Sequence, residues 1–344
     1  GSWLLEPQST NLTPYSEDFS NAYWAKSNTS IIANQSISPS GNLNADKSII
    51  SSSNSYHDAI IGTYNITNGT SYTVSVYGKK NVGIESLYFY NPNTHAIAKF
   101  DLNNGAYIGN AGGNSYNAFL TYGSQNMGDG WYRFYATFNA TSTATNSIVV
   151  GVSTTLADVV LPILGNGTDN LFIWGAQIEQ NSYATSYIPT QGAITTRLKD
   201  VANNSGNANL INSSEGVLYA ELEGLSNGGS SRVISISDGT SSNIVYLEYS
   251  PNLNTIYSVV ISGGGTQAIG STTVINHTET NKIAIKYKLN DFSLWINGTE
   301  TSSDLSGIAP IGLDRFSFHY TTGVAPFYGK TKALAVYKTA LTDA

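Results

Sequence analysis

Short runs in which apolar and polar residues alternate are the feature that most constrains the fold of this chain of 344 residues. Residues 70–79 are the plainest case, because residues two apart along a strand point to the same face of a sheet. Tyr72, Val74 and Val76 share one face, and Thr73, Ser75, Tyr77 and Lys79 share the other. Residues 86–90 and 131–138 repeat the pattern, and the first half of the chain has no helical period of useful length. We therefore predict an all-β protein built from antiparallel sandwiches.

Residues 169–197 mark the expected domain boundary. The apolar run at 171–178 is rich in aromatic and β-branched residues and fits a mostly buried strand. Pro189 and Gly192 end it, and the polar sequence that follows has almost no bulky apolar side chain from which a core could be built. We predict one domain over residues 3–197, a polar linker over 198–214 and a second domain over 215–344.

Composition excludes several partners and chemistries. The formal net charge is -7, and charged residues make up only 11% of the chain. Nucleic acid and anionic membranes need a basic patch, and no run of Lys or Arg supplies one, so we expect neither nucleic-acid binding nor membrane insertion. The absence of Cys removes disulfides, thiol catalysis and Cys-ligated zinc.

Three motifs in the first part of the chain carry a family resemblance. They are LLEPQSTNLTPYSEDFSNAYW near the start, GDGWYRF in the middle, and IWGAQIEQ followed by SYATSYIPT at the end. In this order they resemble a jelly-roll module of bacteriophage tail, fibre and other virion proteins and of some secreted bacterial proteins. That module is similar to the carbohydrate-binding jelly rolls of polysaccharide-degrading enzymes. The resemblance covers residues 3–197 and implies a jelly roll on a virion surface or outside the cell.

The second part predicts another sandwich. The sequence NKIAIKYKLNDFSLWING at 281–298 predicts a hairpin whose core face carries Phe292, Leu294 and Ile296, and the pair Asn297-Gly298 favours a tight turn. Together with the closing GKTKALAVYKTALTDA, it resembles the concanavalin A-like, laminin G-like lectin sandwich. The predicted fold class is all-β, with two β-sandwiches, a jelly roll followed by a concanavalin A-like sandwich.

Glycan binding by a β-sandwich requires aromatic faces that stack on pyranose rings and polar groups that satisfy the sugar hydroxyls. The alternation in the first domain predicts that Tyr77, Tyr88 and Tyr90 line one wet sheet face. Lys79 and Arg133 would there meet an anionic group such as a uronate or a sulfate. The alternative is that these tyrosines merely coat a sheet or pack under a loop.

Two further residues are candidates for ligand contact. His57 lies where a loop meets a strand and is a candidate for lining the cleft. Trp295 faces away from the second core and is a candidate stacking platform. Trp131 and Trp174 lie inside the family-like motifs, and we assign them to the core.

The jelly-roll resemblance also implies a structural calcium ion near the joined terminal strands of the first domain. Calcium takes oxygen ligands, and the candidates there are Asn11, Glu17, Asp18 and Asp169. No ligand motif of fixed spacing, such as an EF-hand loop, occurs in the sequence.

Catalysis finds little support. A retaining glycosidase needs two carboxylates about 5 Å apart across a cleft. Only Glu221 and Glu223 come close in sequence, and we expect both to face solvent on a first or edge strand. The four His residues are too scattered for a polysaccharide lyase site.

The sequence therefore predicts a non-catalytic protein whose partner is a polysaccharide or a cell-surface glycan. The alternative is a structural or decoration domain of a phage tail, fibre or capsid, which contacts other virion proteins and binds no sugar. A polysaccharide lyase or glycoside hydrolase is the third hypothesis.

Overall fold

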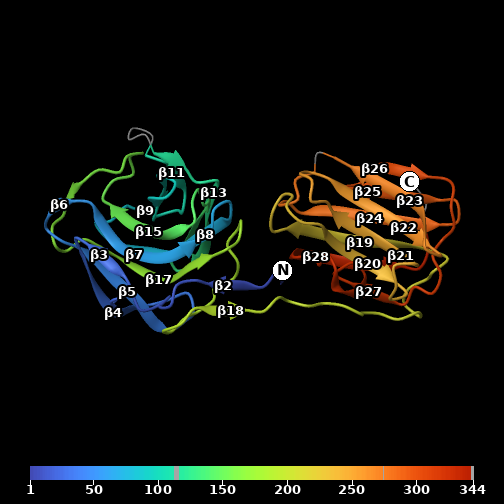
Figure 1. Ribbon diagram of the computed structural model, residues 1–344, viewed down its shortest axis with the longest axis horizontal. Coiled ribbons are helices and arrows are strands. Elements are labelled where there is room, and N and C mark those ends of the chain that lie inside the picture. The colour runs from blue at the N-terminus through green and yellow to red at the C-terminus, as the bar shows by residue number, and fades with distance from the viewer. Residues whose placement is uncertain (112–115, 274, 342–344) are drawn as a thin grey trace. The chain divides into compact units, whose positions relative to one another are not determined.

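The computed structural model describes residues 1–111, 116–273 and 275–341, and the chain divides into two compact β units (Figure 1). The N-terminal unit is Gln8–Leu198, and the C-terminal unit combines Gly1–Pro7 with Lys199–Ala344. The all-β prediction is confirmed, since almost every described element is a strand and the one helical element is a 3-10 turn at Thr321–Gly323. No helix among the described residues is long and apolar enough to cross a membrane.

The N-terminal unit contains a six-stranded antiparallel sheet and a seven-stranded sheet, which is antiparallel except for one short parallel pair. Sheet I consists, in spatial order, of β13 (Thr121–Gly128), β14 (Trp131–Asn139), β8 (Ser71–Val82), β17 (Asn170–Glu179), β5 (Leu43–Ile50) and β4 (Thr29–Ile37). Sheet II consists of β11 (Tyr107–Gly109), β10 (Ala96–Asp101), β9 (Ser86–Asn91), β15 (Ala144–Ser153), β7 (His57–Ile66) and β3 (Ala25–Ser27), and β12 (Asn117–Ala118) pairs in parallel with β10. Two small ribbons pair β6 (Asn54–Ser55) with β16 (Ile163–Leu164) and β2 (Ser9–Asn11) with β18 (Thr195–Arg197).

The strand order of this unit is that of a jelly roll. Sheet I contains the run β5-β17-β8-β14, and sheet II contains the run β7-β15-β9-β10. Along the chain, β5, β7, β8 and β9 alternate between the two sheets, as do β14, β15 and β17. The predicted jelly roll is therefore confirmed by connectivity.

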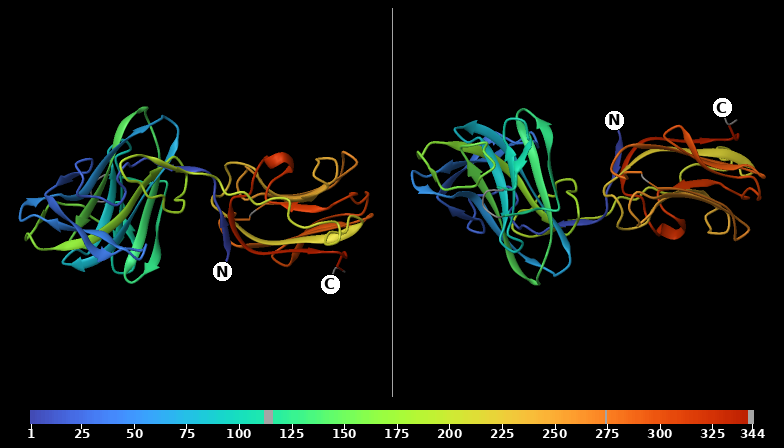
Figure 2. Two further views of the ribbon diagram at one scale, coloured as in Figure 1. Left: turned by 90° about the horizontal axis from the view of Figure 1, so that it is seen from below. Right: turned by 90° about the horizontal axis from the view of Figure 1, so that it is seen from above.

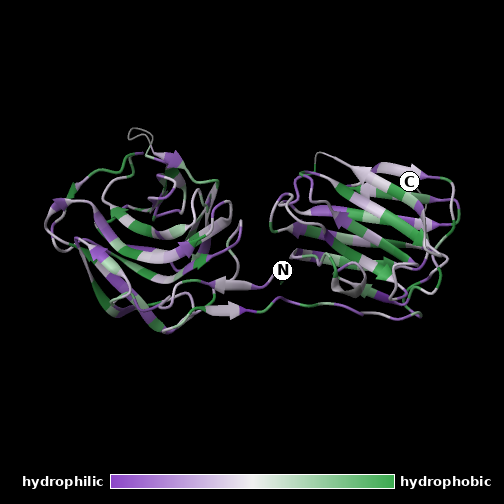
Figure 3. Ribbon diagram, in the orientation of Figure 1, coloured by the Kyte–Doolittle hydropathy of each residue, from purple (hydrophilic) through white to green (hydrophobic). Residues whose placement is uncertain are grey.

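The core of the N-terminal unit lies between sheets I and II. Tyr72, Val74 and Val76 enter it from β8, and Leu87 and Phe89 enter it from β9, as the alternation predicts. Figure 3 shows the same alternation as hydrophobic and hydrophilic bands along the strands. Burying these side chains supplies most of the driving force for pairing the two sheets.

The C-terminal unit is a second antiparallel sandwich. Sheet III consists of β1 (Trp3–Leu5), β28 (Gly329–Tyr337), β19 (Glu215–Gly224), β24 (Asn281–Lys288), β25 (Phe292–Ile296) and β26 (Thr299–Asp304). Sheet IV consists of β23 (Gly265–Thr272), β22 (Ile256–Ser262), β21 (Ile244–Tyr249), β20 (Arg232–Ser237) and β27 (Arg315–Ser317). Figure 2 shows the two sheets of this unit as separate layers. The first and last strands pair within sheet III, and the concanavalin A-like sandwich is as predicted.

The predicted hairpin of the C-terminal unit is confirmed. Phe292, Leu294 and Ile296 all lie in the core. Asn297 and Gly298 have φ angles of 52° and 85°, which is the left-handed conformation that a tight two-residue hairpin turn requires.

The N-terminal residues and the polar segment after residue 198 differ from expectation. Residues 3–7 belong to the C-terminal unit because β1 pairs with β28. The segment expected to be a linker also packs into that unit, where Ser205 pairs with Phe316. Its Ile211 is only 4% exposed and belongs to the core, which the count of bulky apolar residues did not reveal.

Candidate functional site

The outer face of sheet I, which points away from the core, carries a cross-strand row of cationic and aromatic side chains. Phe172 on β17 is directly opposite Lys47 on β5 and directly opposite Lys79 on β8. Lys79 is in turn opposite Trp131 on β14. Directly opposed residues share a sheet face, so Lys47, Phe172, Lys79 and Trp131 form one row, which we call the lysine–aromatic row. Lys47, Phe172 and Lys79 are half-buried, whereas Trp131 is 2% exposed.

A second row lies beside the first and is covered by the segment 180–190. Trp174 is opposite Tyr77, and Tyr77 is opposite Arg133. The rings of Tyr77 and Trp174 meet edge to face with centroids 5.0 Å apart, and Tyr187 lies 4.5 Å from Trp174. Gly175, at a φ of 64°, makes the local irregularity of β17 possible, because a Cβ there would lie 2.8 Å from the Tyr77 ring.

Burial changes the role predicted for Tyr77 and Arg133. Tyr77 is 4% exposed, and burial raises its pKa, so its ring is not open to solvent for stacking. The Arg133 guanidinium lies 5.4 Å from the Tyr77 ring centroid and donates to Thr185 O at 2.6 Å and Ser75 Oγ at 2.9 Å. Both side chains thus support the covering segment 180–190 and are not a free contact surface.

A buried carboxylate anchors the same covering segment. Glu179 has no exposed surface and accepts hydrogen bonds from Ser9 Oγ at 2.7 Å, Gln177 Nε2 at 2.8 Å and Asn181 Nδ2 at 3.1 Å. It also accepts from Thr185 N at 2.9 Å and Thr185 Oγ1 at 2.7 Å. All five partners are donors, which matches the acceptor-only character of an ionised carboxylate.

The lysine–aromatic row leads into an open groove. Between Ile32 and Ser36 the β4–β5 pairing is irregular, and such a bulge bends a strand. The tip of the β4–β5 hairpin consequently reaches Trp131 on β14, whose Nε1 donates to Ile37 O at 3.0 Å. In the sheet itself, β5, β17 and β8 separate β4 from β14. The groove encloses about 620 Å³, and its lining residues are Ser36, Ile37, Ser38, Pro39, Gly41, Lys79, Met127, Gly128, Asp129 and Trp131.

The opposite wall of the groove is the turn between β13 and β14. Gly128, Asp129 and Gly130 have φ angles of 83°, 50° and 79°, a succession that two glycines make accessible. Asp129 is the only carboxylate among the groove's lining residues. Ile37 and Met127 on the two walls are 61% and 39% exposed, so apolar surface as well as hydroxyls faces the groove.

The other two predicted tyrosines lie elsewhere. Tyr88 and Tyr90 are on β9 in sheet II, so the prediction that they share a face with Tyr77 is wrong. The chain changes sheet between β8 and β9, which alternation within each strand cannot reveal. Tyr88 is 4% exposed and donates to Asp58 Oδ1 at 3.4 Å, whereas Tyr90 is half-buried and its ring contacts His95 and Tyr116.

His57 does not line a cleft. Its side chain is fully buried, with Nδ1 2.8 Å from Asn28 O and Nε2 3.2 Å from Ile163 O. The imidazole therefore connects three segments of the N-terminal unit, which is a structural arrangement.

Trp295 lies on the outer face of sheet III, as predicted, and is half-buried. Its Nε1 donates to Ser293 Oγ at 2.9 Å. Ala284 is opposite Trp295 on one side and Tyr219 on the other, so two aromatic rings flank a small side chain.

Glu221 and Glu223 are half-buried on β19, which lies between β28 and β24 in sheet III and is therefore not an edge strand as expected. Glu221 accepts from Tyr219 Oη at 2.7 Å and lies 3.7 Å from Lys332, while Glu223 pairs with Lys330 at 2.5 Å. Each carboxylate is thus engaged by its own partner on the sheet.

The four predicted calcium ligands do not converge. Asn11 is buried and hydrogen-bonded to the backbone of Ala176 and Ile178, near the end of β17. Asp169 precedes the start of β17, roughly 25 Å away at the usual rise per residue. Glu17 and Asp18 do line one open pocket, of about 490 Å³. No group of three or more His, Cys, Asp or Glu placed to hold a metal occurs among the described residues. Calcium itself stays a prediction.

Phe172 and Lys47 are the site residues that the sequence reading missed. The apolar run at 171–178 was read as one mostly buried strand, but Phe172 alternates with Leu171 and Ile173, which are fully buried. The sequence LFIW at 171–174 is an unbroken apolar run, so it did not show that Phe172 faces outward. The register that brings Lys47, Phe172 and Lys79 together was not visible either, because the three strands are distant along the chain.

No family model matches the chain, and no curated protein matches it. Among solved structures, it is similar to the Ruminococcus gnavus IT-sialidase CBM40 bound to alpha2,3 sialyllactose, at 16% identity and a TM-score of 0.35, over 42% of this chain and 92% of that chain. It is also similar to mouse laminin alpha1 chain, domains LG4-5, at 9% identity and a TM-score of 0.28, over 100% of this chain and 96% of that chain.

Proposed function

We propose that the N-terminal unit binds a glycan without catalysis, through the lysine–aromatic row and the adjoining groove. The observation that carries the proposal is Phe172 on an outer sheet face, flanked by Lys47 and Lys79 and leading into a groove with hydroxyl-bearing walls. A partly exposed ring offers a stacking surface for the apolar face of a sugar, and Ser36 and Ser38 offer hydrogen bonds to its hydroxyls.

The composition of the groove favours binding over hydrolysis. The two-carboxylate mechanisms of glycoside hydrolases need a second acid about 5–10 Å from the first, and Asp129 is the only carboxylate among the lining residues. Affinity at one such shallow site is expected to be modest, because polar groups lose water for little buried apolar area. Display of several copies would strengthen attachment by multivalency.

The setting on a phage virion or a secreted bacterial protein, and thus outside the cell, is part of the proposal. The competing function is a structural or decoration domain whose sheet faces contact other virion proteins. A partly exposed aromatic residue between lysines suits a protein partner as well as a sugar, so a binding experiment has to decide between them.

The test is retention of the full chain on immobilised polysaccharides, with Phe172→Ala and Tyr90→Ala as paired variants. Tyr90 is also a half-buried aromatic residue of the N-terminal unit, but it lies on sheet II. We expect retention on at least one glycan, lost in Phe172→Ala and kept in Tyr90→Ala, with both variants folded by circular dichroism. Retention lost only in Tyr90→Ala would move the site to sheet II, and no retention on any glycan would favour the structural function.

A further inference from the structure

We propose that the glycan bound at the lysine–aromatic row is acidic, with carboxylate or sulfate groups that pair with Lys47 and Lys79. This inference rests on the proposed function and specifies its ligand.

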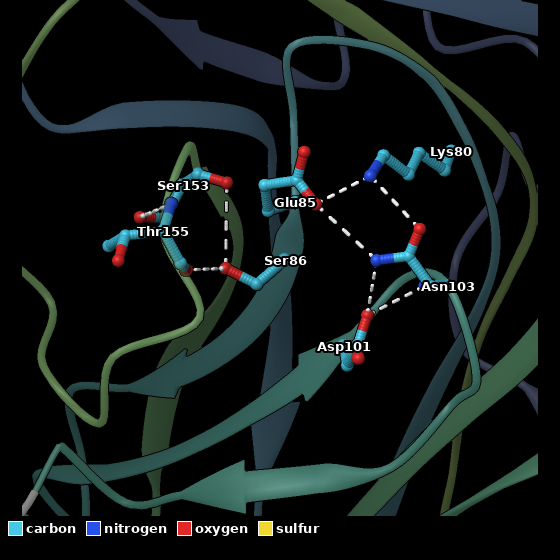
Figure 4. A network of polar contacts seen from close by, with 7 residues as sticks. All are labelled: Lys80, Glu85, Ser86, Asp101, Asn103, Ser153 and Thr155. Atoms are coloured by element: carbon cyan, nitrogen blue, oxygen red, sulfur yellow. Dashed lines mark hydrogen bonds and ion pairs between the residues drawn. The ribbon is translucent and has the colours of Figure 1, made fainter.

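Three of the five lysines in the N-terminal unit are engaged by the protein. Lys26 donates to the carbonyl groups of Ser20 and Asn21, and Lys99 donates to those of Ala157 and Val159. Lys80 pairs with Glu85 at 2.5 Å and donates to Asn103 Oδ1 at 2.9 Å (Figure 4).

The two remaining lysines are the pair on the row. Among residues 1–111, 116–273 and 275–341, neither Lys47 nor Lys79 has an ion-pair or hydrogen-bond partner for its ammonium group. The unit's arginines are both used, since Arg133 holds Thr185 and Arg197 donates to Ser186 O. Its free cationic side chains therefore lie together on the face that also presents Phe172.

The spacing of the two lysines across the sheet suits a repeating acidic polymer. Lys47 and Lys79 are two strands apart with Phe172 between them, so their Cα atoms lie about 10 Å apart. That distance is about the length of a disaccharide unit. A chain laid across the strands would stack one ring on Phe172 and bring acidic groups on either side of it to the two lysines.

The negative net charge of the chain restricts the binding of acidic glycans to the two lysines. The chain has a net charge of -7, which opposes non-specific attraction of polyanions, so acidic glycans would bind only where unpaired cations contact them directly. Such partly exposed ion pairs are screened by salt, and retention should weaken as ionic strength rises.

The experiment compares acidic polysaccharides with uncharged polymers of the same backbone, by affinity electrophoresis of the full chain. One pair is dextran sulfate and dextran, and the other is polygalacturonate and its methyl ester. The variants are Lys47→Gln, Lys79→Gln and the matched control Lys80→Gln. Lys80 is adjacent to Lys79 but points to the opposite face of the strand, toward Leu171 and Glu85.

We expect retention by at least one acidic polymer and less by its uncharged twin. Each of Lys47→Gln and Lys79→Gln should weaken binding roughly three- to tenfold, and Lys80→Gln should change it less than twofold.

Three results would overturn the inference in distinguishable ways. Equal retention by charged and uncharged twins, still lost in Phe172→Ala, would keep glycan binding and remove the acidic specificity. Equal loss in all three lysine variants would reduce the effect to non-specific ion exchange. Absence of binding to every polymer and to a wider glycan panel would remove the proposed function as well.

Discussion

Replacing Glu179 with Gln should destabilise the N-terminal unit strongly. The Glu179 carboxylate accepts from Ser9, Gln177 and Asn181 and twice from Thr185. The Gln side chain has only one acceptor oxygen. If that oxygen takes the position of Oε2, the new NH₂ group takes the position of Oε1 and faces the donors Gln177 Nε2 and Thr185 N. Two buried donors then lose their acceptor, at about 1–3 kcal/mol each. The loss of charge weakens the remaining bonds, which brings the expected decrease in the free energy of unfolding to about 3–5 kcal/mol.

The assay is differential scanning calorimetry of the full chain at neutral pH, with Glu85→Gln as the control. Glu85 is also a paired carboxylate of the N-terminal unit, but its side chain is 32% exposed, and exposed pairs contribute about 0–1 kcal/mol. For a unit of this size, Glu179→Gln should lower the melting temperature by roughly 10 °C, against at most a few degrees for Glu85→Gln. A decrease in Glu179→Gln no larger than that of the control would refute the claim that this carboxylate holds the covering segment.

Three further predictions concern the same unit. Gly151→Ala should lower the free energy of unfolding of this unit by about 1–3 kcal/mol, because the added Cβ would lie 2.0 Å from Tyr88 Cζ. A denaturant titration measures this, and an unfolding midpoint equal to that of the wild type would contradict the packing. Burial lowers the pKa of Lys99 to about 8, below its unfolded value near 10.5, so the unfolded state binds more protons between these values and stability should rise from pH 8 to 9.5. The Lys99→Met variant should lack that rise, and identical pH profiles would exclude Lys99 as its source. The predicted structural calcium should raise the melting temperature in millimolar calcium relative to chelator, and equal values would exclude it.

Alternation in the sequence predicts which face of a strand is buried, and it does so well here. Tyr72, Val74 and Val76 on β8 and Leu87 and Phe89 on β9 all enter the core, as does the hairpin face with Leu294. The physical reason is local, since successive side chains of a strand point to opposite faces whatever the strand pairs with.

The candidate site could be predicted only in part, because it depends on which strands become neighbours. Tyr77 and Tyr88 have the same local pattern, yet they lie in different sheets of the jelly roll. The pairing of Phe172 with Lys47 and Lys79 depends on contacts distant along the chain, which alternation does not determine. Burial of Arg133 under the covering segment likewise depends on the network around Glu179.

A crystal structure of the full chain with an acidic oligosaccharide tests the central claim most directly. We expect electron density for a sugar ring against Phe172, with acidic groups near the ammonium groups of Lys47 and Lys79. Density for the ligand only on sheet II or beside Trp295, with the outer face of sheet I empty at saturating ligand, would contradict it.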